Sequence, residues 1–150
     1  MVCLAGDIGG TKSHLALFER GSERKWLADA KFRSSDYSNL IDIVQEFVSE
    51  NHASIEAACF GVAGPVQDNV CRATNLPWVV DGNEIGKQMG IAKVSLINDL
   101  EANGWGIPAL TEDEFFVLNE GKEHVGNRAL ISAGTGLGEA GSYWDGGRYH

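Results

Sequence analysis

Apolar residues in the first part of the chain fall into short runs separated by glycine or polar turns. Residues 2–8 form the first run, Gly9 and Gly10 interrupt it, and a second run covers residues 13–18. Two short apolar runs on either side of a glycine pair are typical of a β-hairpin. The pattern therefore predicts two strands here and a third strand over residues 26–32.

Beyond this hairpin, strand-like and helix-like patterns alternate. Apolar residues recur at helical spacing over residues 39–48, which predicts a helix capped by Ser38 or Asp36. Asp81 is expected to cap a second helix. The further expected elements are strands over 55–62, 70–74, 93–97, 128–133 and 139–144 and helices over 81–89 and 100–105. This order predicts an α/β protein with a mixed sheet.

Composition and charge narrow the class of partner. The 150 residues carry a net charge of −9, which argues against nucleic acid and anionic membranes. ATP stays compatible, because backbone amides and a metal ion can hold its phosphates. No apolar stretch approaches the ~18 residues of a membrane span. Cys3, Cys59 and Cys71 are odd in number and widely spaced, which favours a reducing cytoplasm. Cys3 and Cys59 lie in apolar runs and are expected in the core.

The first glycine pair belongs to a longer motif, made of Gly6, Asp7, Ile8, Gly9, Gly10, Thr11 and Lys12. Consecutive N–H groups in such a turn form a concave anion site. Asp7 is placed to hold Mg²⁺ directly or through water, while Thr11 adds a hydroxyl and Lys12 a positive charge. A bare glycine pair is usually an ordinary hairpin turn. The order Asp, Gly, Gly, Thr, Lys at the first strand turn favours phosphate binding.

A second glycine turn follows residue 133 and contains Gly134, Thr135 and Gly136. It offers amides and a hydroxyl to a phosphate, although glycine turns are common between paired strands. The spacing of residues 136–141 also fits a dinucleotide fingerprint, but that motif must open a helix and the residues that follow are poor in helix formers. No P-loop motif occurs in the sequence.

Polar residues that suit a sugar occur at two other places. Asn98 and Asp99 follow an expected strand, at the end where α/β sheets bind ligands, and Asp99 is a candidate to accept a hydroxyl proton. A helix N-cap is the alternative role for Asp99, and the two roles are compatible. Asn75 offers donors and acceptors to sugar hydroxyls, and Gly64 and Pro65 end an earlier strand.

Together these motifs resemble the bacterial glucokinase family, within the superfamily of sugar kinases, actin and heat-shock ATPases. The resemblance rests on residues 6–11, 61–65, 74–78, 97–99 and 134–138. It implies a pair of ribonuclease-H-like domains, each with a mixed sheet flanked by helices. Residues 1–108 would form the small N-terminal domain and residues 109–150 the first strands of an incomplete large domain. The implied protein is a cytoplasmic enzyme of glycolysis that transfers phosphate from ATP to the 6-hydroxyl of glucose.

The resemblance also implies a role for each motif. Asp99 matches the catalytic base, Asn98 a sugar-binding residue beside it, and Asn75, Gly64 and Pro65 segments of the sugar pocket. Residues 6–12 match the ATP phosphate site, with Asp7 near Mg²⁺, and residues 134–136 would reach the phosphates from the other side.

Parts of the family pattern are missing from these 150 residues. A Glu-Gly-Gly-His segment, the adenosine pocket and a closing helix are absent, so the chain alone is expected to be inactive. The alternatives are an N-acetylsugar or mannose kinase, a sugar-sensing regulator without activity, and a nucleotide-binding scaffold. A homodimer is compatible with the full-length protein.

Overall fold

The computed structural model describes residues 2–21, 26–122, 124–133 and 137–150. It divides into two compact units, the first reaching to Asp99 and the second covering Leu100–His150. In the described residues the first unit contains two β-sheets and the second unit contains one. The expected strand and helix types are confirmed along most of the chain, and so is the α/β class.

A five-stranded sheet, in the order β3-β2-β1-β4-β8, forms the centre of the first unit. β1 pairs antiparallel with β2 and parallel with β4; β2 also pairs antiparallel with β3, and β4 parallel with β8. The bounds are β1 Val2–Ile8, β2 Lys12–Glu19, β3 Trp26–Arg33, β4 Ile55–Val62 and β8 Lys93–Asn98. The sheet is therefore mixed, as the sequence predicts.

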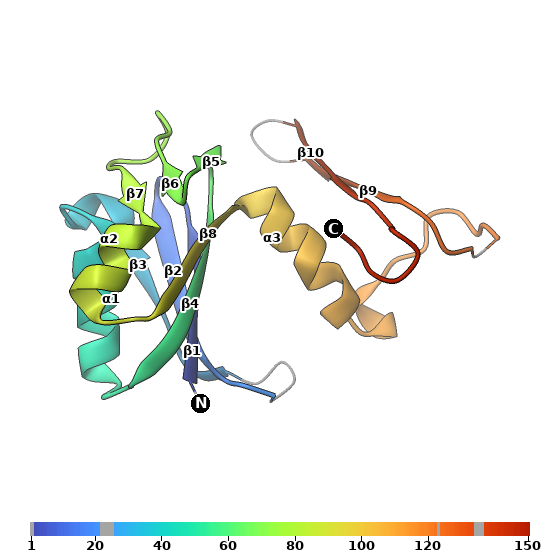
Figure 1. Ribbon diagram of the computed structural model, residues 1–150. Coiled ribbons are helices and arrows are strands. Elements are labelled where there is room, and N and C mark those ends of the chain that lie inside the picture. Colours follow the sequence, from blue (N-terminus) through green and yellow to red (C-terminus); the bar gives the residue numbers. More distant parts are fainter. Residues whose placement is uncertain (1, 22–25, 123, 134–136) are drawn as a thin grey trace. The chain divides into compact units, whose positions relative to one another are not determined.

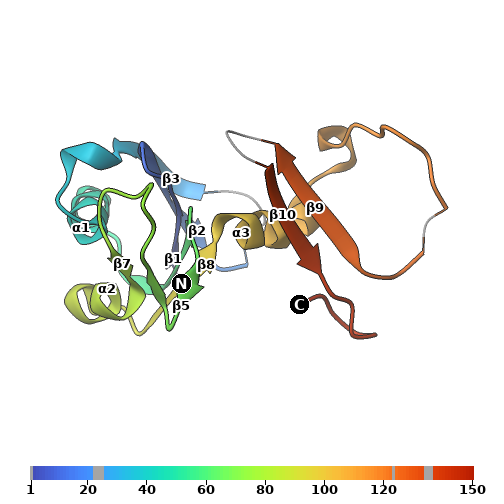
Figure 2. The same ribbon diagram turned by 90° about the horizontal axis from the view of Figure 1, so that it is seen from above.

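Two helices, α1 (Leu40–Glu50) and α2 (Gly82–Met89), lie on one face of this sheet (Figures 1 and 2). Alternate strand residues meet them in a buried core that includes Leu4, Ile8, Leu15, Ile43, Val44, Phe47, Phe60 and Val62. Asp81 caps α2 as expected, because its Oδ1 accepts hydrogen bonds from the backbone N–H groups of Asn83 and Glu84. For α1 the expected caps are wrong.

The cap of α1 is Asn39, whose Oδ1 accepts a hydrogen bond from the backbone N–H of Asp42 at 2.9 Å. The helix begins at Leu40, so Ser38 is one residue too early for this contact, and Asp36 lies in the 3-10 turn Ser34–Asp36. A cap side chain reaches only two or three residues ahead. The residue directly before the helix therefore takes this role.

The cysteines also differ from expectation. Cys59 is exposed and Cys3 half-buried, whereas Cys71 is fully buried. Successive strand residues point to opposite faces, so the burial of Ala58 and Phe60 under the helices turns Cys59 to the opposite face of the sheet.

A small antiparallel sheet of β5 (Val66–Gln67), β6 (Val70–Cys71) and β7 (Val80–Asp81) follows β4. In Figure 1 it lies at the end of the large sheet opposite the N-terminus. The strand expected over residues 70–74 ends at Cys71. Beyond it the backbone turns, and the N–H of Leu76 donates to the oxygen of Ala73 at 3.2 Å.

The second unit has little buried surface. α3 (Asp99–Gly106) leads into two 3-10 turns, Ile107–Ala109 and Glu112–Glu114, and then into an antiparallel hairpin of β9 (Arg128–Ala133) and β10 (Leu137–Ser142). The expected pairing of the last two strands is confirmed. Among the described residues after Leu96, none is buried.

Candidate active site

Three strands of the first unit end at the same edge of the sheet. Ile8 pairs with Val62 across β1 and β4, and Val62 pairs with Asn98 across β4 and β8. The residues that follow these strands therefore meet at the carboxyl edge, where α/β sheets usually bind ligands. Gly9, Ala63 and Asp99 are the first residue after each strand.

The glycine turn after β1 is fixed by an internal hydrogen bond and by hydrogen bonds to the 3-10 turn that follows β3. The N–H of Gly9 donates to the oxygen of Lys12 at 3.0 Å, which closes the turn. Ser34, fully buried, donates from Oγ to the oxygen of Gly9 at 2.8 Å and from its N–H to the oxygen of Thr11 at 3.1 Å. Ser34 also shares a hydrogen bond with Ser13. This role of Ser34 could not be predicted from the sequence, because serine is common in turns.

Residues 6–12 do not all face the turn. Ile8 is fully buried, and a Cβ on Gly6 would lie 2.6 Å from a ring carbon of Phe60 and 2.8 Å from a methyl group of Leu15. These two residues therefore pack the core, and only their backbone is available to a ligand. Asp7, Thr11 and Lys12 are exposed. The side chains at the edge of the sheet thus come from these three.

The segment that carries Asn75 lies directly on this turn. A Cβ on Gly10 would overlap the backbone oxygen of Asn75, so only glycine fits there. Asn75 is exposed and donates from Nδ2 to the oxygen of Ala63 at 3.0 Å. The neighbouring Leu76 is buried. The structure therefore brings the expected phosphate turn and the expected sugar segment into contact.

Asn98 and Asp99, both half-buried, complete the edge. Asn98 donates from Nδ2 to the oxygen of Gly64 at 3.1 Å. Asp99 is the first residue of α3. Burial, and then the negative charge of Asp99, raise the pKa of the Cys71 thiol. Cys71 is thus a further neighbour of Asp99, which an isolated cysteine in the sequence does not reveal.

Gly64 is placed by close packing. A Cβ on this residue would lie 2.6 Å from the Cβ of Ala73 and 2.9 Å from Sγ of Cys71. Pro65 follows it and is exposed. The edge of the sheet thus gathers Gly10, Asn75, Gly64, Asn98 and Asp99. The three residues expected at the second phosphate turn, Gly134, Thr135 and Gly136, lie outside the described residues.

The residues present fit a magnesium ion held mainly by a nucleotide. In the described part of the chain, no three His, Cys, Asp or Glu side chains gather as a metal site. Asp7 is a single exposed carboxylate beside the glycine turn. Mg²⁺ is commonly held by one or two carboxylates together with substrate phosphates.

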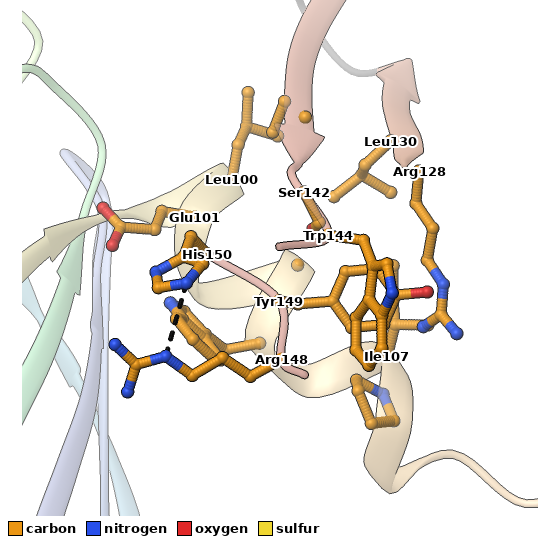
Figure 3. A pocket seen from close by; sticks show the side chains of 15 residues that line it. Leu100, Glu101, Ile107, Arg128, Leu130, Ser142, Trp144, Arg148, Tyr149 and His150 are labelled. Carbon is orange, nitrogen blue, oxygen red and sulfur yellow. Dashed lines mark hydrogen bonds between the residues drawn. The ribbon is translucent and has the colours of Figure 1, made fainter. Parts of the chain in front are cut away.

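The second unit contains a separate apolar cavity of about 640 Å³ (Figure 3). Its lining includes Leu100, Trp105, Ile107, Leu130, Trp144 and Tyr149. The guanidinium of Arg128 lies 4.1 Å from the centre of the Tyr149 ring. Among the expected active-site residues that the structure describes, none lines this cavity, which has the apolar character of a core.

Beside it, His150 Nε2 lies 2.6 Å from Oδ2 of Asp145, and Oδ1 accepts the N–H groups of Gly147 and Arg148. The hydrogen bond to His150, followed by the two backbone hydrogen bonds, lowers the pKa of Asp145 to about 2. This turn joins the bridged residues Trp144 and Tyr149. The charged cluster therefore stabilises a local turn.

The fold is that of sugar kinases. A glucokinase from an Antarctic psychrotroph matches with a TM-score of 0.86 and 26% identity, over 99% of this chain and 48% of that one. The sequence agrees with the fold, because the family model for glucokinase matches residues 4–150. The chain therefore belongs to the glucokinase family. A ROK family glucokinase from Streptomyces griseus, solved with glucose and AMPPNP, shares the fold with a TM-score of 0.68 and 24% identity, over all of this chain and 46% of that one.

Curated relatives named glucokinase are more similar in sequence. Those of Trichormus variabilis and Synechocystis are both 40% identical, over 91% of this chain. The chain spans 41% and 42% of their lengths. Each helix in the described residues is too short or too polar to cross a membrane.

Proposed function

We propose that the full-length protein transfers the γ-phosphate of ATP to the 6-hydroxyl of glucose. The observation that carries this proposal is the meeting of the glycine turn, Asn75 and the Asn98–Asp99 pair at one edge of the sheet. Membership of the glucokinase family supports the same reaction.

Asp99 is the proposed catalytic base. It accepts the proton of the 6-hydroxyl as the oxygen attacks the γ-phosphorus and ADP leaves. Asn98 and Asn75 hold sugar hydroxyls, and Gly64 and Pro65 shape the adjacent wall. The hydrogen bond from Asn98 to Gly64 keeps the Asn98 side chain in one orientation beside the base. Orientation of this kind supplies much of the rate in phosphoryl transfer.

The phosphates of ATP are assigned to the turn over residues 6–12. Backbone N–H groups of the turn and the Thr11 hydroxyl donate to phosphate oxygens, and Lys12 adds a positive charge. A bound Mg²⁺ would neutralise charge that develops on the phosphates, with Asp7 as its protein carboxylate, directly or through water. Gly134, Thr135 and Gly136 are proposed to bind phosphate from the second domain.

For the domains, we propose that residues 1–108 form the small domain and residues 109–150 begin the large one. The rest of the large domain is needed to exclude water and complete the site. The 150-residue chain alone is therefore proposed to be inactive. A cytoplasmic location fits the odd number and wide spacing of the three cysteines, and a homodimer is a proposal for the full-length protein.

The test is Asp99→Asn in the full-length protein. We expect kinase activity to be abolished while ATP binding, measured by calorimetry, stays within threefold of the parent. Glu101→Gln, two residues further along α3 and exposed, is the matched control and should keep activity within twofold. Turnover of Asp99→Asn within tenfold of the parent would remove Asp99 from its role. A panel of glucose, mannose and N-acetylsugars tests the sugar class.

A further inference from the structure

The contact between Gly10 and Asn75 joins two parts of the site that have different proposed ligands. Gly10 is not among the described glycines with a positive φ, so its backbone conformation does not require glycine. Glycine is required because the backbone of Asn75 occupies the position that a Cβ would take. No flexible side chain separates the two segments at this point. A displacement of the turn at Gly10 toward this segment must therefore move the Asn75 backbone.

The Asn75 segment is also held by hydrogen bonds to other parts of the unit. Asn75 is bonded to Ala63, as described above, and Trp78 donates from Nε1 to the backbone oxygen of Tyr37 at 3.1 Å. Leu76 between them is buried in the core of the unit. The segment is thus in contact with the phosphate turn and anchored by two hydrogen bonds and a buried side chain, so a shift of the turn toward it is resisted or transmitted.

The same contacts lead on to the residue before the proposed base. Ala63, which accepts from Asn75, is followed by Gly64, which accepts from Asn98. Gly10, Asn75, Ala63, Gly64 and Asn98 therefore form a continuous series of backbone contacts and hydrogen bonds within one unit. Coupling between sites is carried by packed and hydrogen-bonded groups of this kind.

We infer that the contact of Gly10 with Asn75 couples glucose binding to nucleotide binding, with Gly10 as a positioning residue for the sugar segment. This inference rests on the proposed function. Glucose on Asn75 biases the position of the phosphate turn, and phosphates on the turn bias the position of Asn75. Such coupling is reciprocal, so each ligand must tighten the other by the same factor.

The decisive measurement is the affinity of the full-length protein for glucose without nucleotide, by calorimetry. Gly10→Ala should weaken this affinity at least tenfold, because the added methyl group displaces Asn75. The matched control is Gly86→Ala in α2, outside the proposed site, whose Cβ would lie 3.1 Å from the backbone oxygen of Ile91. It should keep the glucose affinity within twofold. If Gly10 served phosphate binding alone, neither variant would change glucose affinity in the absence of nucleotide.

The second measurement is the coupling factor, the ratio of glucose dissociation constants without and with AMPPNP and Mg²⁺. We expect at least threefold in the parent and a value near one in Gly10→Ala. Trp78→Phe, which loses the hydrogen bond to Tyr37 but keeps an aromatic ring, should lower the factor at least twofold, and it decides the matter if Gly10→Ala does not fold.

The inference would be overturned if Gly10→Ala folds and keeps its glucose affinity within twofold of the parent. If Gly10→Ala does not fold, an unchanged coupling factor in Trp78→Phe would overturn it. A parent protein that binds both ligands independently would overturn it too, while leaving the proposed function intact. A parent that binds neither ligand would instead defeat the proposed function.

Discussion

Asn98 donates a hydrogen bond from Nδ2 to the backbone oxygen of Gly64 at 3.1 Å. The donor is the last paired residue of β8 and the acceptor lies in the turn after β4, so the bond joins neighbouring strands at the end of their pairing. It fixes the side chain that directly precedes Asp99. Loss of this bond should therefore affect both stability and the proposed sugar site.

Asn98→Ala tests this relationship in the full-length protein. A hydrogen bond of this kind contributes about 1 kcal/mol to stability, and its loss should lower the free energy of unfolding by a similar amount. Because Asn98 is also a proposed sugar ligand, we expect KM for glucose to rise at least tenfold while KM for ATP changes less. Steady-state kinetics with each substrate varied in turn measure both values.

The matched control is Asn51→Ala. Asn51 donates from Nδ2 to the oxygen of Phe47 at 2.8 Å, a bond of the same type at the end of α1. It should cost similar stability and leave KM for glucose unchanged. Equal KM values in the two variants would show that Asn98 has a structural role only.

The position of this edge was accessible from the sequence, because carboxyl ends of parallel strands meet. The runs ending at Ile8 and Val62 and the polar pair after Ile97 were sufficient to predict it. The contact of Gly10 with Asn75 was not predictable, because it is a tertiary contact between residues far apart in the sequence, and no local pattern encodes it. Local caps were predicted only when a single candidate, such as Asp81, stood before the helix.

Gly64→Ala should destabilise the turn after β4. The new methyl group would lie 2.6 Å from the Cβ of Ala73, and overpacking of this kind costs about 1–3 kcal/mol. Ala73→Gly removes that neighbour, so the double variant should recover at least half of the lost stability in urea unfolding. Gly106→Ala is the control, because nothing lies within 4 Å of its Cβ and its φ is −76°. Additive losses in the double variant would contradict this account.

Cys71 makes the free energy of unfolding depend on pH in the alkaline range. Burial and the charge of Asp99 raise the pKa of its thiol above the ordinary value of 9.0, so the folded state binds this proton more tightly than the unfolded state. The resulting stabilisation is fully present below about pH 9 and is lost as pH rises through the folded value. Urea unfolding should therefore show a larger loss from pH 7 to pH 10 in the parent than in Cys71→Ala.

The same burial predicts the order of alkylation. Iodoacetamide at pH 8 should modify the exposed Cys59 well before Cys71 in the folded 150-residue chain, as followed by peptide mass spectrometry. After denaturation the two rates should become similar. Comparable rates in the folded chain would mean that the thiol of Cys71 is reached by solvent.

Exposed apolar side chains in the second unit predict a difference in surface hydrophobicity between the 150-residue chain and the full-length protein. Large apolar side chains remain exposed there, among them Phe115, Phe116, Val117 and Leu118, with Phe116 at 86% and Leu118 at 90%. Four consecutive large apolar residues with this exposure are typical of a surface that further protein covers. Because the chain spans 41% of a curated relative, we expect the remaining polypeptide to cover it.

The 150-residue chain should therefore bind the dye ANS strongly and show negligible glucose phosphorylation in a coupled assay, whereas the full-length protein should bind little dye. Replacement of Phe116 and Leu118 by serine should reduce the dye signal of the short chain without altering its far-UV circular dichroism. If the short chain binds no more dye than the full-length protein, these side chains are already shielded from solvent in the short chain. Near-normal turnover from the short chain would refute the dependence of the site on the missing part of the large domain.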